Sequence, residues 1–261
     1  MTKKTAKLSQ NQRLEMIRAQ LLEKGEVFIE DMVKMFDVSL MTVHRDLDIL
    51  EKAGEVLKTH GGATAAKRLT FEFSFRDQVQ NQQKQKEIIA QKAIEIIKPG
   101  DVIMLDTGTT TLEVARKLKN KEGITVITTS LAIVSELQFV DKIDVILLGG
   151  YLRSGSPDIH GPLTEDNIER FRTNIAFIGA DGIDLNGNTF TDDLRIATLS
   201  RRMAKNAEKV VVVSDSSKIG RKSMCKVLSP NEYNLIITDS DICEKILKQL
   251  DVKKNKLMLA N

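Results

Sequence analysis

Residues 38–54 read VSLMTVHRDLDILEKAG, and their spacing decides the fold of the amino-terminal part of the chain. Ser39 is placed to cap a helix over residues 40–53, and Gly54 is placed to end it in a left-handed conformation. Apolar residues recur along this helix at helical spacing, namely Val43, Leu47 and Leu50. The stretch therefore predicts a helix with one buried stripe and a polar opposite face.

Two further helical patterns precede this stretch, and an extended segment follows it. Ser9 and Gln12 form a capping-box pattern, and apolar residues at helical spacing continue from there to Gly25. Residues 29–36 predict a short second helix, and a tight break follows at Asp37-Val38. Residues 56–63 (VLKTHGGA) predict an extended wing that turns at the glycine pair. Three helices followed by a small β wing are typical of a winged helix-turn-helix domain.

The polar face of the third helix carries side chains that can read DNA. Arginine pairs with guanine edges or phosphates, and threonine with phosphates or thymine methyl groups. A solvated helix face is the alternative, but the order of the elements and the basic wing favour a helix that enters the major groove. The predicted DNA-binding residues are Ser39, Met41, Thr42, His44, Arg45, Lys58 and His60.

Charge does not add to this prediction. The net charge is +3, and residues 1–62 hold ten basic and ten acidic side chains, which cancel. The prediction of DNA binding therefore rests on geometry.

The composition changes after the wing. Three phenylalanines between residues 71 and 75 alternate with polar residues ahead of a glutamine-rich stretch, which indicates a linker with an aromatic face. A helix stopped by Pro99-Gly100 then begins a region in which six short, apolar, β-branched runs alternate with helical stretches. Such alternation predicts a largely parallel sheet with helices on both faces. We predict three parts: a DNA-binding domain (1–63), a linker (64–83) and a larger α/β domain (84–261).

A second motif, MLDTGTTTLEVARKL at residues 104–118, predicts a strand that leads through Gly108 into a helix. The helix start offers unpaired N–H groups and the positive end of its dipole, and three successive threonines add hydroxyl donors. Simple capping by threonine is the alternative, but three hydroxyls after a glycine favour an anion the size of a phosphate or carboxylate. The GxxxxGK[ST] pattern of a P-loop is absent, which argues against triphosphate hydrolysis.

Other strand ends carry Gly, Ser, Thr, Asp or Lys residues, and ligands of open α/β sheets gather at the carboxyl ends of strands. Lys218 could neutralise the same anion, although a solvent-exposed lysine is the alternative. The predicted ligand-binding residues are Asp106, Gly108, Thr109, Thr110, Thr111, Thr129, Ser130, Gly149, Gly150, Asp181, Gly182 and Lys218.

Composition excludes several classes of protein. Of the 261 residues, 41% are hydrophobic and 29% charged, which is ordinary for a globular protein and sufficient for two cores. The longest apolar runs fall far short of the roughly 20 residues of a membrane-spanning helix, and we expect no secretory signal, because no apolar stretch follows the charged residues 1–13. Two widely spaced cysteines form neither a disulfide framework nor a CxxC metal pattern. We expect a cytoplasmic protein with no metal site, no cofactor and no membrane partner.

With these motifs laid out, the chain resembles the DeoR family of bacterial sugar-metabolism regulators over essentially its full length. The family's approximate signature V-S-x-x-T-[IV]-R-R-D-L corresponds to residues 38–47, and its H-G-G-A to residues 60–63. Further matches are the D-x-G-T-T run at 106–110, the GG pair at 149–150, G-x-D-G at 179–182 and D-x-S-K at 215–218. Three positions depart from the pattern: His44 replaces the first of two paired arginines, Thr129 a common Asn, and Ile196 a common Glu.

The resemblance implies a winged helix-turn-helix domain joined to an α/β sensor similar in fold to ribose-5-phosphate isomerase and CoA transferases. It implies a repressor of a sugar or sugar-alcohol operon, which binds double-stranded operator DNA as a homo-oligomer (dimer or tetramer) and responds to a phosphorylated sugar. The alternative is a sugar-phosphate isomerase-like enzyme with Asp106 or Asp181 as the base. Because no well-defined acid pair is present, we predict a regulator without catalytic residues. The effector, the operator and the choice between repressor and activator stay open.

Overall fold

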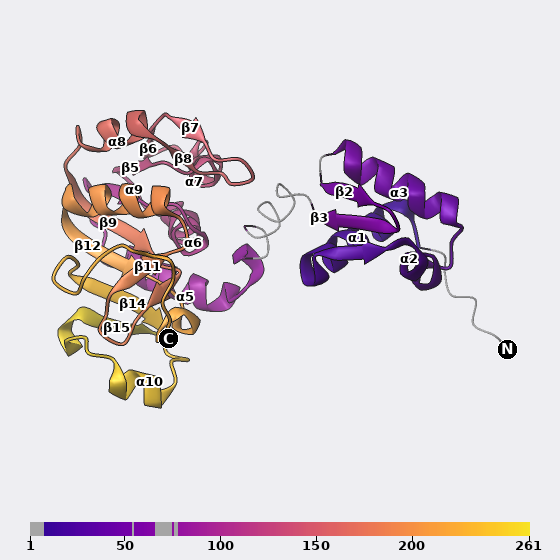
Figure 1. Cartoon of the computed structure of the whole chain (residues 1–261). Coiled ribbons are helices and arrows are strands. Elements are labelled where there is room, and N and C mark those ends of the chain that lie inside the picture. The colour runs from indigo at the N-terminus through magenta and orange to yellow at the C-terminus, as the bar shows by residue number, and fades with distance from the viewer. Residues whose placement is uncertain (1–7, 54, 66–74, 76–77) are drawn as a thin grey trace. The chain divides into compact units, whose positions relative to one another are not determined.

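A computed structural model of the chain describes residues 8–53, 55–65, 75 and 78–261 (Figure 1). The chain divides into two compact units, one extending through Asp77 and one beginning at Gln78. The predicted cap at Gly54 and most of the predicted aromatic linker lie outside the described residues. Within the described ranges, no helix combines the length and the apolar character needed to cross a bilayer.

The first unit contains the three predicted helices. They are α1 (Gln10–Lys24), α2 (Ile29–Phe36) and α3 (Leu40–Lys52). The capping box of Ser9 opens α1, and Gly25 ends it at a φ of 76°. The hydroxyl of Ser39 accepts a hydrogen bond from the backbone N–H of Thr42 at 3.3 Å and so caps α3. The helix positions inferred from capping and periodicity are confirmed.

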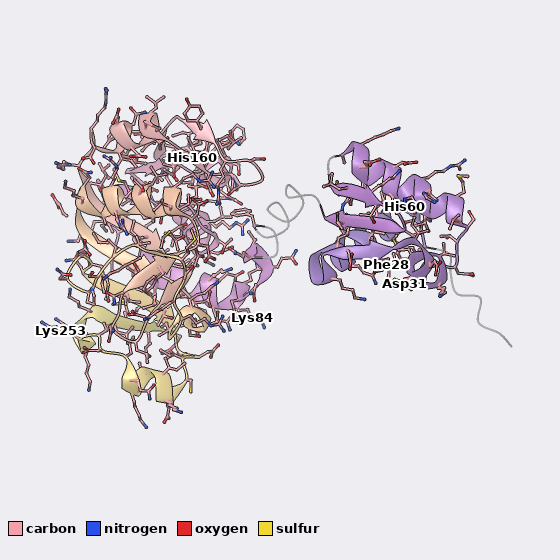
Figure 2. The ribbon with its side chains drawn as sticks, in the orientation of Figure 1. Phe28, Asp31, His60, Lys84, His160 and Lys253 are labelled. Carbon is pink, nitrogen blue, oxygen red and sulfur yellow. The ribbon has the colours of Figure 1, made fainter. Side chains whose placement is uncertain are left out.

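The wing is a three-stranded antiparallel sheet. Its strands are β1 (Glu26–Phe28), β2 (Val56–Thr59) and β3 (Gly62–Ala65), in the order β1-β3-β2. A Cβ at Gly62 would lie 1.8 Å from the carbonyl oxygen of Val27, so this close strand contact requires glycine. His60 lies in the turn between β2 and β3, and Phe28 ends β1 (Figure 2). The sequence analysis predicted β2 and β3 but treated β1 only as a connection.

The predicted stripe of α3 is fully buried in the core of this unit. Val43, Leu47 and Leu50 have no exposed surface, and they pack with Ile17 of α1 and Met32 of α2. Burial of apolar side chains therefore fixes which face of α3 remains outward.

The second unit is built on a seven-stranded sheet in which every pairing is parallel. In spatial order the strands are β15 (Leu257–Ala260), β14 (Leu235–Asp239), β12 (Ala207–Val213), β9 (Thr173–Gly179), β4 (Val102–Leu105), β5 (Ile124–Thr128) and β6 (Ile143–Leu147). The six predicted strands are confirmed. The edge strand β15 was missed because its short run has no β-branched residue to mark it.

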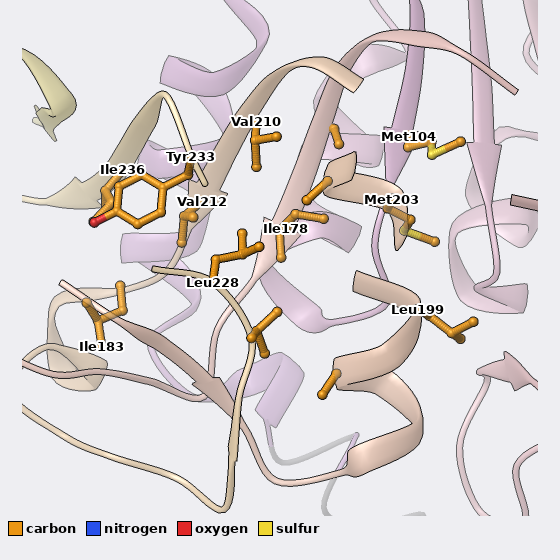
Figure 3. Packing of buried hydrophobic residues seen from close by; sticks show 14 of the residues in the cluster. Met104, Ile178, Ile183, Leu199, Met203, Val210, Val212, Leu228, Tyr233 and Ile236 are labelled. Carbon is orange, nitrogen blue, oxygen red and sulfur yellow. The ribbon is translucent and has the colours of Figure 1, made fainter. Parts of the chain in front are cut away.

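Helices cover both faces of this sheet, as predicted. The described helices of this unit are α5 (Gln83–Ile94), α6 (Thr109–Leu118), α7 (Leu131–Leu137), α8 (Pro162–Ile168), α9 (Leu194–Lys205) and α10 (Glu244–Gln249). Figure 3 shows Ile178 and Val212 of the sheet in one core with Leu199 and Met203 of α9. Because neighbouring strand residues point to opposite faces, the alternate residues meet the other helical layer.

One helix boundary differs from the expectation. The helix before Pro99 was predicted to continue up to that proline, but α5 ends at Ile94. Ile97 nevertheless stays buried. Its backbone N–H bonds back three residues to the carbonyl of Ile94, so tighter turns replace the α-helix before the proline.

Short elements complete the unit at the carboxyl ends of the strands. A small antiparallel sheet comprises β10 (Gly182–Ile183), β11 (Thr189–Thr191) and β13 (Cys225–Lys226), and a hairpin comprises β7 (Tyr151–Leu152) and β8 (Ile159–His160). The 3₁₀ turn η1 (Ser216–Lys218) follows β12 at this edge, whereas the 3₁₀ turn η2 (Lys254–Lys256) directly precedes β15 at the opposite edge. Since β4, β9 and β12 are neighbours, the connections that follow them meet at one edge of the sheet.

Candidate nucleic-acid interface and anion pocket

The polar face of α3 and the wing expose the side chains predicted to read DNA. Met41 is 62% exposed, Arg45 is exposed, and Thr42 and His44 are partly exposed. Ser39, Lys58 and His60 are also exposed. A helix that presents these groups while burying its apolar stripe has the form that a major-groove reader needs.

A buried ion pair, which the sequence analysis missed, fastens α3 to α1. Asp46 has no exposed surface, and its two carboxylate oxygens accept hydrogen bonds from the Arg13 guanidinium at 2.7 and 3.1 Å. Gln10 donates to the same carboxylate at 3.3 Å. The missed signal was an acid next to Leu47 on the buried side of the helix. The pair holds the reading helix against its neighbour with a two-point contact.

Lys58 of the wing is engaged by acids of α3. Its ammonium donates to Asp48 and lies 3.4 Å from a carboxylate oxygen of Glu51. The hydrogen bond from Lys58 lowers the pKa of Asp48 and raises that of the lysine. A phosphate contact by Lys58 would therefore require it to exchange one set of anionic partners for another.

A polar pocket lies at the carboxyl ends of β4, β9 and β12. Its lining residues are Gln78, Asn81, Lys86, Asp106, Thr107, Gly108, Thr109, Thr110, Gly179, Ala180, Asp181, Thr191, Ile196, Asp215 and Lys218. Six of the predicted ligand-binding residues thus surround one space: Asp106, Gly108, Thr109, Thr110, Asp181 and Lys218. The described residues contain no group of three or more His, Cys, Asp or Glu side chains that could hold a metal ion.

The other predicted ligand-binding residues do not line this pocket. Thr111 is buried and its hydroxyl donates to the Gly108 carbonyl at 3.0 Å. A Cβ at Gly150 would lie 2.0 Å from the Thr164 hydroxyl oxygen, so that glycine permits a close packing contact. The remaining four are Thr129, Ser130, Gly149 and Gly182.

The floor of the pocket contains a buried acid with a shifted pKa. Asp106 is 2% exposed, and burial raises its pKa to about 7. The Ser200 hydroxyl and the Thr107 backbone N–H, each at 2.8 Å, donate to its carboxylate and oppose the shift. Asp106 can therefore change its protonation near neutral pH.

Two other acids on the lining already have partners in the chain. Asp181 accepts from the Thr191 hydroxyl at 2.7 Å and from the Asp192 backbone N–H at 3.1 Å. Asp215 accepts from the Ser217 backbone N–H at 3.1 Å. These contacts satisfy the carboxylates as structural acceptors and fix the loops of the pocket.

Two cations and a helix start face the same space. Gly108, at a φ of 146°, is the N-cap of α6, and Thr109 and Thr110 are the first residues of the helix. Lys218 closes η1, and Lys86 reaches in from α5. Lys86 was not predicted, although it shares the buried stripe of α5 with Ile89, Ala90 and Ala93. This arrangement of donors and positive charge suits an anion.

Family models match both units of the chain. The DeoR-like helix-turn-helix domain matches residues 13–68, and the DeoR C terminal sensor domain matches residues 81–240. The chain belongs to the DeoR family. The predicted resemblance and fold class are confirmed, and the chain is a DNA-binding transcriptional regulator.

Curated relatives agree with this membership. The chain is 33% identical to the glycerol-3-phosphate regulon repressor of Escherichia coli (strain K12), over 89% of this chain and 92% of that protein. It is 30% identical to the transcriptional regulator GolR of Listeria innocua, over 87% and 89%. Because such DeoR-family relatives are named as regulators, the choice of a regulator over an enzyme is confirmed.

A solved structure that resembles the chain is ribose 5-phosphate isomerase A from Methanocaldococcus jannaschii. The identity is 23%, the TM-score 0.41, and the match covers 53% of this chain and 55% of that one. A shared function does not follow from similarity at this level.

Proposed function

We propose that this DeoR-family regulator is a repressor of an operon for the use of a sugar or sugar alcohol, and that a phosphorylated intermediate bound in the pocket resets it. The observation that carries the proposal is the convergence of Lys86, Lys218 and the start of α6 on one polar space. A phosphate group satisfies N–H and hydroxyl donors and compensates both cations. The neighbouring acceptors, Asp106 among them, suit the hydroxyl groups of a sugar or polyol.

The name of one relative supports the class of operon. The glycerol-3-phosphate regulon repressor takes its name from the phosphate ester of a sugar alcohol. For the present chain we infer the broader class, a phosphorylated sugar or polyol, since specificity depends on which hydroxyl groups the loops contact.

Operator recognition is proposed for the exposed face of α3 and the wing. One small reading domain contacts few base pairs, so a homo-oligomer, either a dimer or a tetramer, would place two or more such domains on repeated half-sites. The effector would act by binding one arrangement of the oligomer more tightly than the other. We propose the cytoplasm as the site of action, since a DNA-binding regulator acts where the operator DNA lies.

A gel-shift series tests the proposal. The full-length protein is mixed at moderate salt with DNA from upstream of its own and neighbouring genes, with and without candidate sugar phosphates. We expect a specific complex that at least one phosphorylated sugar or polyol weakens. Absence of binding to every such DNA at that salt concentration would contradict operator recognition, and a complex unaffected by all the phosphates would contradict the proposed effector class.

A further inference from the structure

Lys86 is the unusual residue of the pocket, since its ammonium bonds to the chain segment that opens the second unit. The ammonium donates to the carbonyl oxygens of Gln78 and Asn81, the latter at 2.7 Å. We propose that Lys86 binds the anionic group of the effector and thereby couples occupancy of the pocket to the order of residues 78–83. This inference rests on the proposed function, because it requires that the pocket bind an anion.

The charge of Lys86 is poorly compensated without a ligand. The residue is 4% exposed, and burial lowers the pKa of its ammonium. In the described part of the chain, no carboxylate lies within ion-pair distance of it. The more distant carboxylates of Asp215 and Glu113 oppose the lowering of this pKa, and the ammonium of Lys218 adds to it. A buried charge whose direct contacts are neutral carbonyls costs free energy, part of which an incoming anion can recover.

The chemistry of an ammonium allows both partners at once. It has three N–H donors, and the carbonyls of Gln78 and Asn81 use two of them. A phosphate oxygen can take the third without displacing either carbonyl. The added negative charge holds the proton on Lys86 and so strengthens both carbonyl bonds. Anion binding should therefore tighten residues 78–83 rather than release them.

Residues 78–83 lie where a change in their order can affect both the pocket and the start of the second unit. Residues 78–83 follow the end of the first compact unit at Asp77 and lead directly into α5. Two residues of the segment, Gln78 and Asn81, also line the pocket. A change in their order is therefore a change at the start of the second unit, next to the end of the first unit along the chain.

The test uses the full-length protein with inorganic phosphate as the probe, against chloride at the same ionic strength. Calorimetry measures phosphate affinity, and hydrogen-deuterium exchange follows peptides that cover residues 78–83. The variant Lys86→Met keeps the length of the side chain and removes its charge. Lys84→Met is the matched control, because Lys84 is exposed on the same helix (Figure 2).

We expect phosphate to slow exchange of residues 78–83 in the wild-type protein. Lys86→Met should weaken phosphate binding by about tenfold or more, exchange faster without ligand, and lose the response to phosphate. Lys84→Met should behave as the wild type. If Lys86→Met does not fold, the response of the wild-type segment to phosphate decides the question without a variant.

The outcomes separate this inference from the proposed function. Wild-type protein that binds operator and phosphate while residues 78–83 exchange unchanged or faster overturns the coupling and leaves the proposed function standing. Unaltered phosphate binding by Lys86→Met overturns the role of this lysine in the same way. Wild-type protein that binds neither phosphate nor any sugar phosphate overturns the effector part of the proposed function, and the coupling with it.

Discussion

The DNA-reading face and the anion pocket are built in different ways. The first comes from one continuous stretch, residues 39–60, in which helical spacing decides which side chains point outward. The second gathers residues from α5 and from the connections after β4, β9 and β12. Local periodicity therefore specifies a reading face directly, whereas a pocket also depends on which strands become neighbours.

The largest effect is expected on the stability of the first unit, because α3 depends on an ion pair with a residue of α1. Asp46→Ala leaves the buried Arg13 guanidinium without its carboxylate and should destabilise the first unit by roughly 2–3 kcal/mol. The loss stays at the lower end for a buried pair because Arg13 keeps its hydrogen bond to the Leu8 carbonyl. Hydrogen exchange of α1 and α3 amides in the full-length protein measures the loss. Asp48→Ala, on the outer side of the same helix, is the control. If the amides of α1 and α3 in Asp46→Ala exchange as slowly as in the wild type, the buried apolar stripe of α3 is sufficient to hold the helix in place.

A smaller effect is expected on the affinity for operator DNA, in a variant that keeps its fold. Arg45→Ala removes an exposed cation from α3 and should weaken operator binding by about 10- to 100-fold, with the thermal stability unchanged. Gel shifts and promoter occupancy in the cell measure the change. Lys52→Ala, in the last turn of the same helix, is the matched control. Full promoter occupancy by an Arg45→Ala, Thr42→Ala double variant would refute the reading face.

The buried acid of the pocket should make stability depend on pH. Burial raises the folded-state pKa of Asp106 from 3.8 to about 7, so the folded protein holds a proton that the unfolded chain has lost. The stability that this proton provides is complete below about pH 4 and is lost as the pH rises through about 7. Between pH 5.5 and 6.5 the wild type should lose about 1 kcal/mol relative to Asp106→Asn.

Thermal melts of the two proteins at matched ionic strength give this difference, and the histidines cancel because both proteins contain them. Parallel pH profiles would mean that Asp106 is already ionised in the folded state, and the pocket floor would then be more polar than its burial indicates.

The smallest effect concerns the ion pair between wing and helix. Asp48→Asn removes one acid that engages Lys58 and should strengthen operator binding about threefold at low salt. The slope of log affinity against log salt should steepen by about 0.9 if Lys58 then contacts a phosphate. Titrations at several salt concentrations measure both. In the double variant Asp48→Asn, Lys58→Ala the slope should return to the wild-type value. If the slope stays steeper, the stronger operator binding comes from the loss of the Asp48 charge and not from Lys58.

Much of the first unit could be predicted because its signals are local. The caps at Ser9 and Ser39 use side-chain oxygens to satisfy nearby backbone N–H groups, and the residue order alone reveals them. Helical spacing places Asp46 on the buried side of α3, but its partner could not be predicted, because Arg13 lies in another helix. A single acid at a stripe edge carries no mark of its partner.

Only the part of the pocket that consecutive residues form, the start of α6, could be predicted from the sequence. Glycine and threonines at a helix start indicated anion chemistry, and Thr109 and Thr110 do line the pocket. Lys86 was missed because the packing of α5 beside α6, which brings it to the pocket, is not encoded in its neighbours. The sequence of a glycine pair does not say whether it faces a ligand or a neighbouring side chain, and Gly150 permits a close contact with Thr164.

The strand order of the wing has a mechanical consequence. The last described strand of the first unit, β3, pairs with both β1 and β2. The polypeptide thus departs from the middle of that small sheet and not from its border. A force applied at the end of β3 would have to break the hydrogen bonds to β1 and those to β2 at the same time. All three strands of the sheet would therefore resist it together.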